Sequence, residues 1–297
     1  MFDIIIIGAG PAGMTAALYA LRSNKNVLLL ESKSYGGQIV NANIIENYPG
    51  IANISGFDFA TNLFNQIKKL GVIYKNESVN RIENKFVITN NDKYYGKAII
   101  VATGCDKKLL NIKDEEKYIG RGISYCATCD GNFYKNKVVA VVGGGNTALE
   151  DALYLSNIAK HVYLIHRRDI FRGENKYLDD IKKKNNIKII YNATVKELIG
   201  DDYLNAIKIS ENDKVNQINI DGLFIAIGQQ PNNECFKQTI DIDDYGYIIS
   251  SDGVHTNCQN IYVAGDIRKK NLRQLTTATA DGALAATIAI KEIEETD

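Results

Sequence analysis

A strand, a glycine-rich turn and a helix follow one another twice in this chain, and this repeat constrains the fold more than any other feature. The first copy has an apolar run at 2–7 and a turn at 8–13, and the second has a run at 137–142 and a turn at 143–148. In both copies an apolar helical stretch and a second short strand come next. Short β-branched runs connected by helices are typical of parallel strands buried in an α/β sheet. The sequence therefore predicts an α/β protein with two Rossmann-like dinucleotide-binding domains.

The first turn carries the pattern Gly-x-Gly-x-x-Gly, formed by Gly8, Gly10 and Gly13 between a strand and a helix. Glycines allow a tight turn and a close approach of the backbone to a pyrophosphate, which the free N–H groups of the helix N-terminus bind. The next strand, 27–30, is followed by Glu31, whose carboxylate can accept hydrogen bonds from ribose hydroxyls. This turn is predicted to bind an adenosine whose ribose carries no phosphate.

The second unit differs from the first at the position of the acidic residue. His166 lies 135 residues after Glu31, the same offset that separates Gly143 from Gly8. The basic segment that begins there contains His166, Arg167, Arg168 and Arg172. A carboxylate would repel a 2′-phosphate, whereas planar guanidinium groups bind one bidentately. The segment favours NADPH over NADH, and the alternative is a solvated basic loop without a ligand.

Cys126 and Cys129 are separated by two residues, and Asp130 follows them directly. In an intracellular protein with strand–helix–strand patterning, this spacing indicates a redox pair that closes a small disulfide ring. A neighbouring carboxyl suits proton transfer, because dithiol and disulfide interconvert with gain or loss of protons. The alternative is half of a zinc site, which needs two further ligands. The remaining cysteines and histidines show no ligand spacing, so no metal is expected: Cys105, Cys235, Cys258, His161, His166 and His255.

Composition excludes several classes of function. The 297 residues suggest about two domains. Lysines plus arginines equal aspartates plus glutamates at 35 each, which gives no support for binding to nucleic acid or an anionic membrane. Five cysteines, an odd number in a long chain, do not fit a secreted disulfide framework. The uncharged run 4–21 is broken early by glycines and a proline and has no basic residue before it, so we expect neither a membrane span nor a signal segment.

Further strands are expected where apolar runs end in glycine. The runs 98–102, 223–227 and 261–264 each resemble the last strand of a nucleotide-binding sheet, whose carboxyl end borders the ligand. Shorter strands are predicted at 85–89, 187–191 and 206–210, and an alanine-rich helix at 276–294.

With these motifs in order, the sequence resembles the low-molecular-weight bacterial thioredoxin reductases. The resemblance runs nearly end to end and includes both glycine turns, the cysteine motif and the arginine motif. It also includes Gly36-Gly37-Gln38, Glu46-Asn47-Tyr48-Pro49-Gly50, Ala264-Gly265-Asp266, and Arg273-Gln274 with Ala278 beyond. Gly173 departs from the family pattern, which often has alanine there.

The resemblance implies the domain organisation. A domain of residues 1–112 and 243–297 would bind FAD non-covalently, and an inserted domain of residues 113–242 would bind NADPH and carry the cysteine pair. The connecting segments would be 114–116 and 241–246. The resemblance further implies a cytoplasmic homodimer whose protein partner is thioredoxin or a thioredoxin-like redoxin.

The family's binding residues map onto positions of this chain. The FAD residues implied are Gly8, Gly10, Ala12, Gly13, Glu31, Gly37, Gln38, Asn47, Gly265, Asp266, Arg273, Gln274 and Ala278. The NADPH residues implied are Gly143, Gly145, Asn146, Thr147, His166, Arg167, Arg168 and Arg172.

The resemblance also implies a mechanism in which NADPH reduces the flavin and the flavin reduces the cysteine disulfide. Cys129 would face the flavin, Cys126 would attack the partner, and Asp130 would transfer protons. The inserted domain would have to rotate, since nicotinamide and the cysteine pair both need the flavin. Three alternatives stay open: a thiol oxidase that passes electrons to oxygen, a ferredoxin-dependent reductase, and a nucleotide-binding redox sensor. The arginine motif weighs against the first two, because neither needs NADPH.

Overall fold

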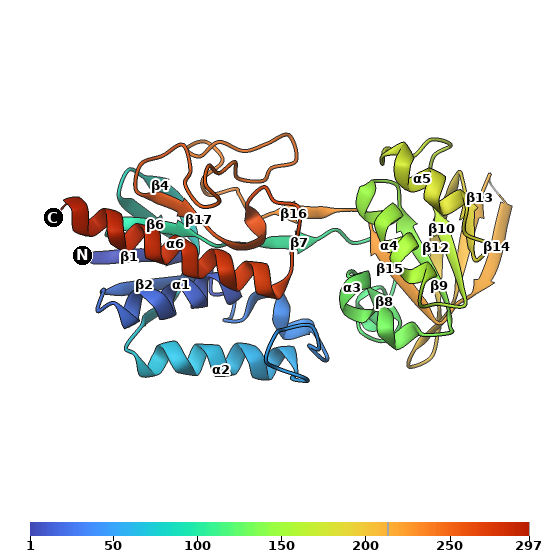
Figure 1. Ribbon diagram of the computed structural model, residues 1–297, viewed down its shortest axis with the longest axis horizontal. Helices are drawn as coiled ribbons and strands as arrows, with labels where there is room; N and C mark the ends of the chain where they lie inside the picture. Colours follow the sequence, from blue (N-terminus) through green and yellow to red (C-terminus); the bar gives the residue numbers. More distant parts are fainter. Residues whose placement is uncertain (213, 297) are drawn as a thin grey trace. The chain divides into compact units, whose positions relative to one another are not determined.

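The structure, a computed structural model, describes residues 1–212 and 214–296. Asp213 and Asp297 fall within the predicted domain ranges but lie outside the described residues. The chain divides into two compact units, one of Met1–Asp106 with Gln230–Asp297 and one of Lys107–Gln229 (Figure 1). Over the described part of the chain, no helix is both long enough and apolar enough to cross a membrane.

The first unit is built on a largely parallel sheet. Its strands run in the order β3 (Ile73–Asn76), β2 (Val27–Glu31), β1 (Phe2–Ile7) and β6 (Lys93–Val101), and β17 (Ile261–Val263) also pairs with β6. Two antiparallel strands, β5 (Phe86–Thr89) and β4 (Val79–Glu83), extend the sheet from β6. The register places Ile4 beside Val27 on one side and Ala98 on the other.

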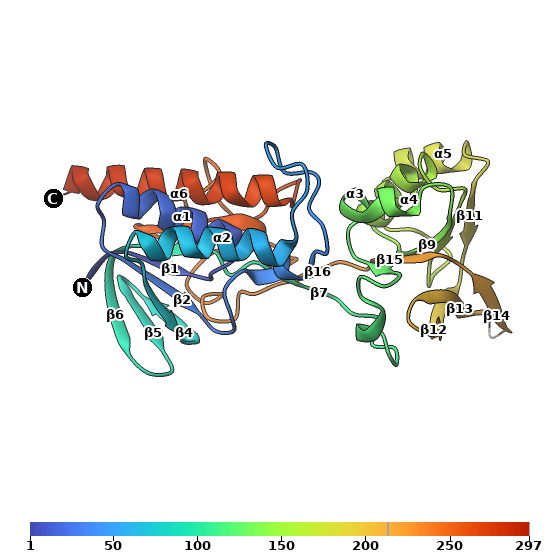
Figure 2. The same ribbon diagram turned by 90° about the horizontal axis from the view of Figure 1, so that it is seen from below.

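Three helices cover one face of this sheet. They are α1 (Pro11–Arg22), α2 (Gly56–Lys69) and α6 (Leu275–Thr296), and α1 lies between the other two (Figure 1, Figure 2). Because side chains alternate along a strand, Ile4 and Ile6 pack towards these helices. Ile5 and Ile7 pack on the opposite face, against Phe236 and other residues of the returning chain. Both faces are therefore buried, as the β-branched run predicted.

The second unit repeats this plan. Its parallel sheet has the order β11 (Ile187–Ile190), β10 (His161–Ile165), β9 (Val138–Gly143), β15 (Gly222–Ala226) and β8 (Ile123–Ser124). Its helices are α3 (Ala127–Asp130), α4 (Asn146–Ser156) and α5 (Asn175–Lys182). A separate antiparallel sheet contains β12 (Ala193–Gly200), β13 (Leu204–Glu211) and β14 (Lys214–Asn219). In each unit, the strand before the glycine turn lies in the middle of the parallel sheet, as in Rossmann-like folds.

The chain passes between the units twice. At these crossings β7 (Cys105–Lys107) pairs with β16 (Gln229–Pro231). The sequence placed the crossings later, at 112/113 and 242/243, and side-chain packing accounts for the difference. Lys107 lies over the Tyr125 ring of the second unit, with Nζ 4.5 Å from the ring centre. Phe236 is buried in the core of the first unit. The two segments predicted as connections, 114–116 and 241–246, therefore lie inside the units.

Candidate active site and cofactor sites

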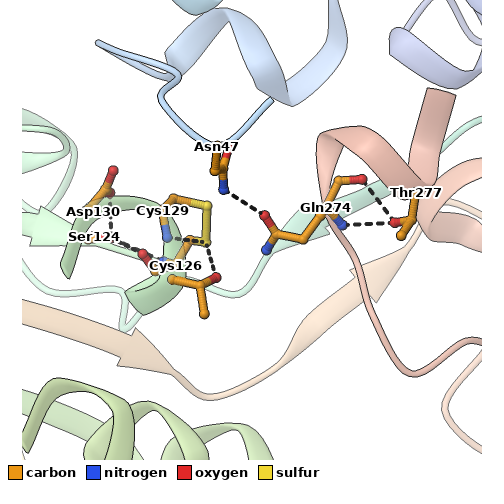
Figure 3. The surroundings of a disulfide bond; sticks show 8 residues. Asn47, Ser124, Cys126, Cys129, Asp130, Gln274 and Thr277 are labelled. Carbon is orange, nitrogen blue, oxygen red and sulfur yellow. Dashed lines mark hydrogen bonds between the residues drawn. A yellow bond between two sulfur atoms is a disulfide. The ribbon is translucent and has the colours of Figure 1, made fainter. Parts of the chain in front are cut away.

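The cysteine pair lies at the start of a short helix in the second unit. Cys126 precedes α3, and its sulfur is bonded to that of Cys129, with the two Cα atoms 5.3 Å apart (Figure 3). The backbone N–H of Cys129 also donates to the Cys126 sulfur, at an N···Sγ distance of 3.2 Å. The Cα separation lies within the usual range for a disulfide, and the turn that begins α3 brings the two side chains together. Cys129 is exposed and Cys126 is half-buried.

Asp130 lies beside the disulfide and is held by Ser124. The Ser124 hydroxyl donates to Asp130 Oδ2 at 2.6 Å, and it accepts the Cys126 N–H at 3.1 Å (Figure 3). Burial raises the pKa of Asp130, and the Ser124 hydrogen bond partly offsets that rise. Asp130 precedes a short 3₁₀ helix, η3 (Gly131–Tyr134), but its side chain makes no capping hydrogen bond there. The carboxyl is thus positioned for proton transfer and does not act as a helix cap. Ser124 was not identified from the sequence, because no spacing rule links it to Asp130.

The zinc alternative finds no support at this pair. The two sulfurs are oxidised to a disulfide. Among residues 1–212 and 214–296, no group of three or more histidine, cysteine or acidic side chains could hold a metal ion. The other three cysteines are thiols: Cys105, Cys235 and Cys258. Burial raises the pKa of Cys105 to about 12 and that of Cys235 to about 11, which disfavours the reactive thiolate.

The first glycine turn leaves space for a ligand at one specific glycine. A Cβ on Gly8 would lie 2.4 Å from the Ala102 carbonyl oxygen, and one on Gly13 would lie 1.9 Å from the Gly8 carbonyl oxygen. Both glycines are therefore required by the protein's own packing. Gly10 is different, because a Cβ there would meet nothing within 4 Å and its φ of −75° suits any residue. The missing side chain at Gly10 leaves open space directly before the N-terminus of α1, where a pyrophosphate would bind.

Other segments of the first unit converge on this turn. Glu31, at the end of β2, accepts the Ala9 N–H at 2.9 Å from its Oε2. A Cβ on Gly37 would lie 3.1 Å from the Gly10 Cα, so the Gly37 segment lies against the turn. The turn η4 (Gly265–Ile267) approaches α1 as well, since a Cβ on Gly265 would lie 2.8 Å from the Ala12 Cβ.

The last of the predicted FAD residues lie near η4 or at the start of α6. Arg273 donates to the Asp266 carbonyl at 3.2 Å, and Asn47 donates to the Gln274 side chain at 3.2 Å (Figure 3). Ala278 is buried in α6. Gln38 donates to Asp106 at 2.9 Å. The donors, the open glycine and the helix N-terminus together fit a dinucleotide such as FAD.

The second glycine turn has the same construction. A Cβ on Gly143 would lie 2.3 Å from the Ala226 carbonyl oxygen, and one on Gly144 would lie 2.0 Å from His166 Cε1. A Cβ on Gly145 would meet nothing within 4 Å. Asn146 and Thr147, both exposed, begin α4 directly afterwards. The open glycine again stands at a helix N-terminus.

The basic segment is fixed to this turn by its backbone. The N–H groups of Arg172 and Gly173 both donate to the Gly144 carbonyl, at 2.8 and 3.2 Å. His166 is buried, stacks on Phe171 with ring centres 4.4 Å apart, and has its Nε2 3.0 Å from the Ile170 carbonyl oxygen. The arginines that follow it, Arg167, Arg168 and Arg172, are exposed. The backbone of this segment thus contacts the open glycine turn at Arg172, its arginine side chains are exposed, and the histidine is packed against Phe171.

Comparisons with known proteins agree with this arrangement. Residues 2–282 match the model of the family described as pyridine nucleotide-disulphide oxidoreductase. The thioredoxin reductase of Mycoplasma genitalium is 41% identical over 293 residues, which are 96% of this chain and 93% of that protein. The thioredoxin reductase of Listeria monocytogenes is 42% identical over 99% of this chain and 95% of its own length. The crystal structure of thioredoxin reductase from Streptococcus pyogenes superimposes with a TM-score of 0.95, at 39% identity and 99% coverage of both chains.

Proposed function

This chain belongs to the pyridine nucleotide-disulphide oxidoreductase family, and we propose that it works as an FAD- and NADPH-dependent thioredoxin reductase. One observation carries the proposal most directly. A Cys126–Cys129 disulfide with a half-buried carboxyl beside it lies in a chain that has two separate dinucleotide turns. A disulfide reductase that uses two dinucleotides needs these three parts.

The two units divide the cofactors between them. The first unit binds FAD through the Gly10 turn and the segments that converge on it. The second unit binds NADPH through the Gly145 turn, with the 2′-phosphate held by Arg167, Arg168 and Arg172. Exposed guanidinium groups beside an open glycine support this division, and the absence of an acidic residue at position 166 supports NADPH over NADH.

FAD held by the first unit would supply two-electron transfer from NADPH to the Cys126–Cys129 disulfide, and Cys129 is the cysteine that we expect to exchange electrons with it. The Cys126 thiolate then attacks the disulfide of thioredoxin, forms a mixed disulfide, and releases one thioredoxin sulfur as a thiolate. Cys129 attacks Cys126 in turn, which restores the internal disulfide and releases the second thioredoxin sulfur. Asp130 exchanges protons with the sulfurs as they gain or lose them, and its raised pKa suits that task.

The protein is also proposed to be a homodimer. A groove of about 560 Å³ on the first unit is lined largely by apolar side chains, among them Leu18, Ile51, Phe59 and Ala283. Phe57, at the start of α2, is 60% exposed. An apolar surface of this kind suits a second copy of the chain.

The thiols outside the redox pair suit a reducing compartment, so we place the protein in the cytoplasm. No contact with nucleic acid or membrane is proposed.

The decisive experiment follows NADPH oxidation and thioredoxin disulfide reduction together in a mixture of the FAD-loaded protein, NADPH and oxidised thioredoxin. We expect equal amounts of both, and no turnover in Cys126→Ser or Cys129→Ser. Cys126→Ser should show a long-wavelength charge-transfer absorbance between the Cys129 thiolate and oxidised flavin, which Cys129→Ser should lack.

Other outcomes would identify the alternatives. Oxygen consumption without a redoxin would indicate a thiol oxidase. Turnover with reduced ferredoxin in place of NADPH would indicate the ferredoxin-dependent class. Binding of NADPH with no turnover of any redoxin would indicate a sensor.

A further inference from the structure

A buried carboxylate on α6 is surrounded by cations that the proposed mechanism does not use. Asp281 is 6% exposed. Its two oxygens accept Nε and Nη2 of Arg268, each at 2.9 Å, in a bidentate pair. Asp281 Oδ2 also accepts Nζ of Lys270 at 3.0 Å and the backbone N–H of Gly265 at 3.1 Å. Burial by itself raises the pKa of Asp281, but Arg268 and Lys270 outweigh that effect and hold the pKa below its usual value. The group is therefore ionised at neutral pH.

The cluster connects the segments that hold the predicted FAD residues. The Lys270 ammonium, whose side chain is only 6% exposed, also lies 3.2 Å from Oδ1 of Asp266. The neighbour of Asp281 in α6, Gly282, packs on the first turn of α1, where a Cβ would lie 2.1 Å from the Ala12 carbonyl oxygen. Gly265 approaches Ala12 from another side. One carboxylate thus ties η4 and the segment after it to α6, and α6 contacts the first glycine turn.

We infer that Asp281 is a positioning residue for FAD: it holds the Gly265–Ile267 turn and the segment up to Gln274 in the conformation that binds the cofactor. This inference rests on the proposed function. A buried ion pair is costly to assemble and adds little net stability over an apolar packing, but removing one partner leaves the other charge buried and unpaired. Without the carboxylate, Arg268 and Lys270 would move towards water and carry with them the backbone next to Asp266 and Arg273.

The test compares FAD binding by apoprotein of the wild type, Asp281→Asn and Glu292→Gln. Glu292 is the matched control, because it is a carboxylate on the same helix that accepts hydrogen bonds from Tyr262 at 2.6 Å and His255 at 2.8 Å. Binding is followed by flavin fluorescence anisotropy, well below the melting temperature of every variant. Asp281→Asn is expected to raise the dissociation constant of FAD by about ten- to a hundredfold, because FAD binding would then have to restore a turn conformation that a charge-assisted hydrogen bond of Asp281 no longer holds. It should also shift the visible absorption of flavin at saturating FAD. Glu292→Gln should lower the melting temperature and leave both readouts unchanged.

Each outcome decides a separate question. A wild type that does not bind FAD would refute the proposed function itself. A wild type that binds FAD, with Asp281→Asn binding it equally well, would refute the positioning role. Equal losses in Asp281→Asn and Glu292→Gln would also refute it, because the effect would then follow the stability of α6.

If Asp281→Asn does not fold, Arg268→Lys replaces it, since lysine keeps the charge and loses the bidentate pair. An unchanged dissociation constant in Arg268→Lys would overturn the inference. Retention of each variant on immobilised adenosine 2′,5′-bisphosphate reports separately that the second unit is folded.

Discussion

At the scale of single residues, Asp130 differs from an ordinary helix-terminal aspartate. Its carboxylate accepts the Ser124 hydroxyl and makes no capping hydrogen bond. Burial raises its pKa, so the protonated carboxyl is favoured in the folded state relative to the unfolded one. The stability that this protonated form contributes is fully present below the usual aspartate pKa of about 4, and it is lost as pH rises through the raised folded-state pKa.

Asp130→Asn tests both the chemistry and this linkage. Asparagine can still accept the Ser124 hydrogen bond, but it cannot transfer a proton. Thioredoxin reduction should slow by about 10²- to 10⁴-fold, and flavin reduction by NADPH should stay close to wild type. The difference between the two melting temperatures, variant minus wild type, should increase from pH 4 to pH 8. The reason is that only the wild type loses stability when the residue 130 side chain ionises. Unchanged turnover would leave Asp130 with a structural role alone.

At the scale of elements, the two glycine turns are built in the same way, with some glycines packed against the protein and one glycine beside open space. In each turn the protein packs closely against two glycines, which are Gly8 and Gly13 in the first turn and Gly143 and Gly144 in the second. A Cβ on the N-cap glycine of the following helix, Gly10 or Gly145, would meet nothing within 4 Å. Conformation does not require glycine at either N-cap, because both have extended backbone. A ligand that approaches the backbone closely would account for glycine at both positions.

Alanine at these two positions should therefore affect ligands without affecting the fold. Gly10→Ala should keep the melting temperature of the apoprotein and weaken FAD about tenfold or more, since an overpacked contact costs about 1–3 kcal/mol. Gly145→Ala should leave FAD binding intact and raise KM for NADPH by a similar factor. Gly13→Ala is the contrast, because its Cβ would lie 1.9 Å from the Gly8 carbonyl oxygen and should destabilise even the apoprotein. Wild-type FAD affinity in Gly10→Ala would mean that the cofactor does not contact this turn.

In the arginine segment, the backbone contacts the glycine turn, whereas the arginine side chains are exposed. Its backbone is fixed by the Gly144 carbonyl, so removing a guanidinium should not move the loop. Arg167→Ala or Arg168→Ala should raise KM for NADPH about ten- to a hundredfold and change kcat little. The increase in KM should be nearer the lower value, because the arginine side chains are exposed to solvent and salt. Steady-state kinetics with NADH should be unchanged, and the preference for NADPH should weaken as salt rises. Lys176→Ala, an exposed cation on α5, is the control. Equal losses with both cofactors would show that these arginines stabilise the loop.

At the scale of the whole molecule, the groove on the first unit that is lined by residues of α1, α2 and α6 exposes apolar side chains to solvent. Ala283→Arg places a charge in this groove and should convert a dimer to a monomer, as measured by light scattering after gel filtration. Thr287→Arg, one turn further along α6 at an exposed position, should leave the mass unchanged. A wild-type mass equal to one chain would contradict the homodimer, and a dimeric Ala283→Arg would place the interface elsewhere.

Local patterns predicted most of the fold. The strand β1 has the bounds that the sequence predicted, and each of the other predicted strands and helices is present. The helix α2 was missed, although Ser55 Oγ caps it by accepting the Asp58 N–H and the Ser-x-x-Asp spacing is a readable signal. β14 was missed because it is almost wholly exposed and its polar sequence has no clear alternation. β12 was missed because a register shift between Val195 and Glu197 interrupts the alternation of its buried side chains.

The sites were predictable only where chemistry follows spacing along the chain. The cysteine pair and both glycine turns are local. The structure places each glycine turn at the end of a strand, as expected, and it places the cysteine pair after β8, which the sequence did not predict. Ser124 and Asp281 were not found, because their partners become neighbours only after folding. The positions of the crossings depended in the same way on tertiary contacts, such as Lys107 over Tyr125.

The insertion of one unit into the other also sets an order of synthesis. All of the second unit has been made once residue 229 is complete, whereas the first unit still lacks β17 and α6. Until α6 is made, α1 has no partner for its packing against Gly282, and the apolar faces of β1 and β6 are only partly covered. At about 5–20 residues per second, synthesis of residues 230–297 takes several seconds. On the ribosome the inserted unit can therefore fold first, while apolar side chains of the N-terminal strands stay exposed until α6 has been made.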